Sequence, residues 1–188
     1  MRIERLRANY QIDVQFVHFP LHPDTLEEGM TLEELFAGRN IDIPAAKDRM
    51  VRLMATEGLP YGERSMTYNS RLAQEMAKWA ESQQTEGNVH DAFFQAYFVD
   101  GVNLAKIDNV VLIAVRLGLS ADEARNVLTT RRFREAVDAD WQRSRQMGVT
   151  GVPTFVVGER GVVGAQPYES LEQLVLDAGV ETRSTMTS

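Results

Sequence analysis

The chain has 188 residues, of which 44% are hydrophobic and 25% are charged, so it can bury a sizeable core. Its net charge of -7 disfavours contact with a phosphate backbone, and we expect no nucleic-acid partner. No run approaches the ~20 apolar residues of a membrane span. The first residues also lack the apolar segment of a signal peptide, so we expect a cytoplasmic protein with no membrane partner.

The sequence contains no cysteine, which excludes disulfides, thiolate catalysis and cysteine-ligated metals within this chain. Its three histidines are His18, His22 and His90. No carboxylate pattern around them completes a zinc site. We therefore expect structural or surface roles for the histidines, no metal site and no cofactor.

The N-terminal segment predicts a helix end followed by a strand. Residues 1–10 carry arginines in their last turns, where cations suit the helix dipole. In Ile12–Phe19, apolar residues such as Val14 and Phe16 alternate with polar ones before the segment becomes apolar throughout, which predicts a strand. Pro20 ends it, because proline cannot donate a ladder hydrogen bond.

The middle of the chain, from Asp24 to about Thr130, predicts four to six helices with no strand between them. Its clearest start signal is Thr31-Leu32-Glu33-Glu34. This is a capping box, in which the threonine hydroxyl and the glutamate carboxylate satisfy free backbone N–H groups. Ser120 to Glu123 predicts a second capping box.

The C-terminal part predicts a helix over residues 131–147, a β-hairpin and a final helix. The strands of the hairpin are expected at Thr154–Val157 and Val162–Ala165, with a turn at Glu159–Gly161. Residues 168–178 carry the apolar stripe of an amphipathic helix.

Several conspicuous side chains have ordinary structural explanations. The aromatic residues at helical spacing are expected in the core: Trp79, Phe93, Tyr97 and Trp141. Asn69 is expected to cap the helix that follows it. A group of arginines is expected on a solvated face rather than at an anion site: Arg131, Arg132 and Arg134.

The most specific motif is Val149-Thr150-Gly151-Val152-Pro153-Thr154-Phe155, placed directly before the predicted hairpin. A Val-Pro bond can adopt the cis form at a cost of only ~0.5–1 kcal/mol, and the glycines permit backbone angles that other residues resist. The motif resembles the cis-proline loop of thioredoxin folds. The resemblance implies a substrate-binding site at Thr150, Val152 and Pro153, where an extended peptide adds to the backbone as a strand.

Other stretches resemble the DsbA family, most closely its FrnE-like branch, which shades into the 2-hydroxychromene-2-carboxylate isomerases. They are Phe16-Val17-His18-Phe19-Pro20-Leu21, Tyr68-Asn69-Ser70-Arg71-Leu72-Ala73, Ala96-Tyr97-Phe98-Val99-Asp100-Gly101 and Gly164-Ala165-Gln166-Pro167. The resemblance implies an α/β, thioredoxin-like fold with a helical insertion domain. We expect a discontinuous thioredoxin-like domain at 1–25 and 131–180, an inserted helical domain at 26–130 and a disordered tail at 181–188.

Members of this family begin with a strand and a Cys-x-x-Cys at the start of the first helix, and both are missing here. We expect the natural protein to start upstream of Met1. The resemblance implies a thiol–disulfide oxidoreductase acting on a protein or peptide thiol or disulfide, with no catalytic residue in this chain.

Two alternatives remain open for the function. The first is a non-catalytic peptide-binding module, and the second is a glutathione-dependent isomerase. The helical insertion can also form a homodimer.

Overall fold

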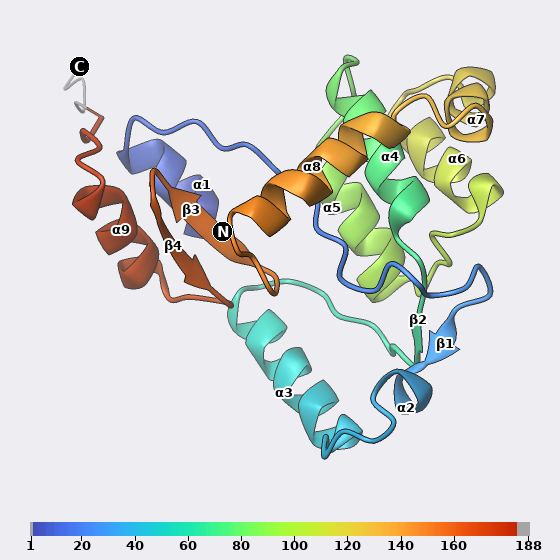
Figure 1. Ribbon diagram of the computed structural model, residues 1–188, viewed down its shortest axis with the longest axis horizontal. Coiled ribbons are helices and arrows are strands. Elements are labelled where there is room, and N and C mark those ends of the chain that lie inside the picture. Colours follow the sequence, from blue (N-terminus) through green and yellow to red (C-terminus); the bar gives the residue numbers. More distant parts are fainter. Residues whose placement is uncertain (1, 184–188) are drawn as a thin grey trace. The chain divides into compact units, whose positions relative to one another are not determined.

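The structure is a computed structural model that describes residues 2–183 (Figure 1). Its contacts divide the chain into two compact units. Unit 1 comprises Met1–Leu21 and Asp140–Ser188, and unit 2 comprises His22–Ala139. Helix α8 (Arg134–Gln146) is continuous across the boundary between Ala139 and Asp140.

Unit 1 is built on an antiparallel hairpin whose strands are joined by Gly158 and Glu159. The register pairs Phe155 with Val162, so the first strand is where it is predicted, whereas the second strand begins at Arg160, two residues before the predicted Val162. Its elements are β3 (Thr154–Val157), β4 (Arg160–Val163), α1 (Arg2–Asn9), α9 (Tyr168–Asp177) and the C-terminal part of α8.

One face of the hairpin packs against α1 and α9. Side chains alternate across a strand, so Phe155 and Val157 point to the same face as Val162 of the neighbouring strand. These three side chains contact a buried cluster that joins the two helices and consists of Leu6, Tyr10, Tyr168, Leu171 and Val175. The hairpin therefore has one packed face and one face left for other contacts.

Ile12–Phe19, predicted to be a strand, has no regular secondary structure, and this prediction is wrong. A strand is stabilised by the neighbour that completes its hydrogen bonds. Within residues 2–183 no strand pairs with this segment. Its backbone finds another partner instead, because the N–H of His18 donates to the Asp140 carboxylate at 3.0 Å.

The end of α1 pairs with residues 181–183, the start of the segment expected to be disordered. An isolated antiparallel bridge joins Tyr10 to Thr182. The backbone N–H of Arg183 donates to the Asn9 carbonyl at 2.8 Å, and its Nε donates to the Tyr10 carbonyl at 2.9 Å. Residues 184–188 lie outside the described part of the chain.

Unit 2 is mainly helical, but it also contains a two-residue strand pair that the sequence did not predict. Met30 pairs with Thr67, and Thr31 with Met66. The elements are β1 (Met30–Thr31), α2 (Leu32–Leu35), α3 (Ile43–Thr56), β2 (Met66–Thr67), α4 (Arg71–Glu81), α5 (Val89–Phe94), the π-helix η1 (Gln95–Val99), α6 (Ile107–Arg116), α7 (Ala121–Thr129) and the first turns of α8.

The core of unit 2 lies between α4, α6 and α7. Helix α4 buries Met76 and Trp79 against Val110 of α6 and Val127 of α7. The predicted capping box at α2 is confirmed, because the Thr31 hydroxyl and the Glu34 side chain both bind backbone N–H groups. Within residues 2–183, no helix is long and apolar enough to cross a membrane.

Candidate functional site

The loop that carries the predicted site begins at the C-terminus of α8, in unit 1. Gly148 has φ of +69°, a left-handed conformation that glycine adopts without steric cost. Its N–H donates to the Arg145 carbonyl, and the N–H of Val149 donates to the Ser144 carbonyl, both at 3.0 Å. This pair of bonds is a Schellman motif, which ends the helix and turns the chain toward β3.

Two hydrogen bonds fix the far end of the loop to the hairpin. The Thr154 hydroxyl donates to the Gly151 carbonyl at 2.7 Å, and the N–H of Gly164 donates to the Pro153 carbonyl at 2.8 Å. The peptide bond between Val152 and Pro153 is cis. The loop is therefore held at both ends by the elements that it joins.

The three predicted site residues lie together on the surface of this loop. Thr150, Val152 and Pro153 are all exposed, and Val152 keeps 48% of its surface accessible. No residue of the described range 2–183 makes a hydrogen bond to the backbone of Val152. The peptide group before the proline is therefore available to a ligand.

Strand β3 continues this free backbone along its outer edge. In an antiparallel pair, successive residues direct their N–H and C=O groups alternately toward the partner strand and away from it. Because Pro153 bonds across to Gly164, the groups of Thr154 and Val156 point away from β4. No second strand pairs with that edge within residues 2–183.

An open hollow of about 390 Å³ adjoins the unpacked face of the hairpin. Its charged lining residues are Glu159 and Arg160, and Arg160 binds the Asp177 carboxylate at 3.0 Å. The lining consists of Met147, Gly148, Val149, Thr154, Val156, Gly158, Glu159, Arg160, Gly161 and Val163. The lining thus consists mostly of apolar side chains and glycine backbone.

The three histidines are divided between the two units. His18 belongs to unit 1, whereas His22 and His90 belong to unit 2. His90 is partly exposed and lies 3.1 Å from Glu81. Among residues 2–183 no three His, Cys, Asp or Glu side chains are grouped to hold a metal ion.

Ser70, and not the expected Asn69, is the N-cap residue of α4, whereas Asn69 binds the first residue of the helix and two carbonyl groups. Its side-chain oxygen accepts from the N–H of Arg71 at 2.9 Å. Its amide nitrogen also donates to the carbonyls of Pro23 and Thr25, each at 2.9 Å. Asn69 therefore holds the loop before β1 as well as the start of α4.

Unit 2 contains a buried ion-pair network that the sequence did not indicate. Glu75 of α4 is 0% exposed, and its carboxylate accepts hydrogen bonds from Arg71 at 2.7 Å and from Arg131 at 2.7 and 2.9 Å. Arg71 also binds the Asp138 carboxylate at 2.7 Å and the Arg134 carbonyl at 2.8 Å. Burial alone would raise the pKa of Glu75, but the two arginines hold it below its ordinary value.

The sequence predicts a solvated face for Arg131, Arg132 and Arg134. Arg131 departs from this prediction, because its guanidinium binds a buried carboxylate. It is the non-glycine residue with a positive φ, +54°, in the described chain, and this conformation ends α7 and delays the start of α8 to Arg134. Glycine usually fills such a position. Here the guanidinium is needed to pair with Glu75, which lies 56 residues away in the sequence.

A helix end, a loop with a cis-proline, a β-hairpin and a closing helix, in a chain that also has a helical unit, define a thioredoxin-like protein. The sequence matches the DSBA-like thioredoxin domain family over residues 1–176. The chain belongs to this family.

Several known proteins are similar to this chain in sequence or structure. The chain is similar to the crystal structure of a probable DsbA oxidoreductase, SCO1869 from Streptomyces coelicolor. The two sequences are 28% identical, and the structures superpose with a TM-score of 0.84 over 100% of this chain and 86% of that one. A 2-hydroxychromene-2-carboxylate isomerase structure shares the fold at 20% identity and a TM-score of 0.58, over 73% of this chain and 66% of that one. The uncharacterized protein YwbO of Bacillus subtilis (strain 168) is 27% identical over 85 residues, 45% of this chain and 42% of its own length.

Proposed function

We propose that this chain forms the polypeptide-binding part of a DsbA-family thiol–disulfide oxidoreductase. The observation that carries the proposal is the exposed Val152, whose backbone makes no hydrogen bond within residues 2–183. A substrate strand would bind there through main-chain hydrogen bonds, with its side chains over the hollow. The proposal gains support from the family assignment and from the likeness to a probable DsbA oxidoreductase.

The thiol chemistry itself requires groups that these 188 residues do not contain. Disulfide exchange proceeds by attack of a thiolate on a disulfide sulfur, and the chain has no cysteine. The role of the chain in that reaction is to hold the substrate backbone. The reacting thiols would come from outside this sequence.

A peptide-binding measurement tests the site directly. A fluorescent ten-residue peptide rich in valine and threonine should bind, and backbone NMR shifts should concentrate at Thr150–Val156. The Val152→Pro variant removes one N–H and should weaken binding by roughly ten-fold, as expected for a lost hydrogen bond. A matched peptide with N-methylated backbone amides should bind more weakly. Equal affinity of the N-methylated and the unmodified peptide would contradict strand addition.

A second candidate function is a peptide-binding module without catalysis, which the absence of cysteine favours. Two measurements separate the candidates: the intact mass of the protein purified from its source, and the sequence of the DNA upstream of the Met1 codon. A longer product with Cys-x-x-Cys supports the oxidoreductase, and a serine at that place supports a glutathione-dependent isomerase. A natural product of these 188 residues supports the binding module and refutes the oxidoreductase.

A further inference from the structure

The loop that leads into β1 is held rigidly by side-chain amides of unit 2. Asn69 binds the carbonyls of Pro23 and Thr25, as described above, and the Asn103 side chain donates to the Glu27 carbonyl at 2.9 Å. These bonds fix the backbone on both sides of the loop tip. A surface loop with this many satisfied carbonyls has little conformational freedom left to lose on binding.

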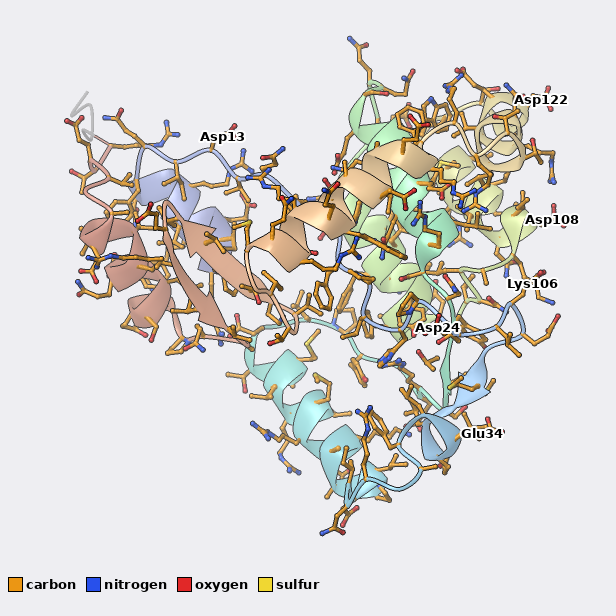
Figure 2. The ribbon with its side chains drawn as sticks, viewed as in Figure 1. Asp13, Asp24, Glu34, Lys106, Asp108 and Asp122 are labelled. Carbon is orange, nitrogen blue, oxygen red and sulfur yellow. The ribbon has the colours of Figure 1, made fainter. Side chains whose placement is uncertain are left out.

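At the tip of this rigid loop, Leu26 projects into solvent. It is 73% exposed, the highest value among the large hydrophobic residues of the described chain, although its carbonyl accepts a bond from the N–H of Gly29 at 3.0 Å. Residues 24–28, which we call the acidic loop, also carry Asp24 and two adjacent glutamates. Figure 2 labels Asp24, and Lys106, whose ammonium lies 3.1 Å from Glu28. The acidic loop thus presents a fixed apolar anchor, Leu26, with the carboxylates of Asp24 and Glu27 near it in the sequence.

Helix α3, in the same unit, has the opposite charge and an uncovered apolar face. None of its residues is buried, and it stands apart from the bundle of α4 to α7 (Figure 1). Met50, Val51 and Leu53 are exposed by 41–44%, and Arg49 and Arg52 flank them. Three cationic residues and one anionic residue give the helix a net charge of +2, on a chain whose total is -7.

We propose that the acidic loop of one copy of this chain binds the apolar, cationic face of α3 in a second copy. A two-fold axis would form the same contact twice, so that each copy contributes one loop and one helix. Leu26 would fill a space among the exposed apolar side chains of α3, and the carboxylates of the loop would meet its arginines. Direct pairing of two α3 helices is disfavoured, because it would bring like charges together.

Sedimentation of the purified chain tests this dimer. The Val156→Lys substitution blocks the free edge of β3 in all samples, so that strand-to-strand association does not contribute. In that background we expect a reversible dimer, which Leu26→Asp should weaken by at least roughly ten-fold. The matched control is Leu112→Asp, at a leucine of α6 that is 60% exposed, and it should dimerise as the parent does. A monomeric parent, or equal effects of both substitutions, would overturn the proposal.

A charge exchange tests the pairing of the two surfaces. The variants Asp24→Lys/Glu27→Lys and Arg49→Glu/Arg52→Glu should each be monomeric, with unchanged circular dichroism. An equimolar mixture should form a heterodimer with both loop–helix contacts, because the native loop of one variant meets the native helix of the other and the two charge-reversed surfaces meet each other. A mixture that stays monomeric would refute the pairing. A third outcome would also overturn the dimer: the parent forms no dimer but binds phosphatidylserine vesicles, and Arg49→Glu/Arg52→Glu loses that binding. This result would assign α3 to a membrane surface instead.

Discussion

Replacing Arg131 by glycine separates the cost of its backbone conformation from the benefit of its charge. A non-glycine residue in the left-handed region costs about 1–2 kcal/mol, and φ of +54° places Arg131 there. Its guanidinium also makes two hydrogen bonds to Glu75, which is 0% exposed. Removing one partner of a buried ion pair costs about 3–5 kcal/mol.

The net effect of Arg131→Gly follows from these two contributions. The loss should lie at the lower end, about 3 kcal/mol, because Arg71 still binds Glu75 and the Arg131 side chain is 41% exposed. Relief of the backbone conformation returns about 1 kcal/mol. We therefore expect the variant to be less stable by about 2 kcal/mol, or roughly 4–8 °C in Tm for a chain of this length.

Urea unfolding followed by tryptophan fluorescence measures this difference. Trp79 is buried in α4, so a Trp141→Phe background restricts the signal to unit 2. Arg131→Gly at or above the stability of the parent would refute the reasoning, because backbone preference would then outweigh the ion pair. Adding Glu75→Gln should make Arg131→Gly less costly than it is alone, since the amide no longer needs a cation.

Three further predictions concern unit 2. Thr31→Ala removes the hydroxyl that accepts from the Glu34 N–H, leaves the backbone N–H at this position bound to the Glu34 carboxylate, and should cost about 1 kcal/mol in the free energy of unfolding, measured by urea denaturation. Gly29→Ala should destabilise more than Gly38→Ala: both have positive φ, but a Cβ at Gly29 would lie 2.4 Å from the Tyr68 ring, and one at Gly38 meets nothing within 4 Å. Equal losses in thermal denaturation would contradict this steric account. Burial, with neighbouring arginines, lowers the pKa of His22 in the folded chain, so the unfolded chain binds the proton more tightly. Stability should therefore fall as pH drops below about 6.5, and His22→Gln should remove that part of a pH titration of Tm.

The local signals in the sequence predicted local structure well. The capping box at Thr31 and Glu34 marks the start of a helix because its partners are three residues apart. The motif before the hairpin likewise placed Thr150, Val152 and Pro153 in one exposed loop, since a short segment holds all three. Binding of a substrate by these residues remains a proposal.

Features that depend on residues far apart in the sequence could not be predicted from such local signals. The alternation in Ile12–Phe19 describes a surface that suits a sheet, but no neighbouring strand lies beside it in the described chain. Arg131 stands among other arginines, and nothing local distinguishes it as the partner of Glu75. The short pair of β1 and β2 similarly joins segments 35 or more residues apart, from Thr31 with Met66 to Met30 with Thr67.

The anchoring of the loop before β1 bears on how the chain resists proteolysis. By composition the run from Pro23 to Gly29 looks like an accessible, cleavable connector. A protease must draw several residues into an extended form, however, and here that means breaking the amide bonds of Asn69 and Asn103 first. Nicking should therefore follow local unfolding of unit 2 instead of preceding it. Surface position alone does not make a segment susceptible when its carbonyl groups are already bound.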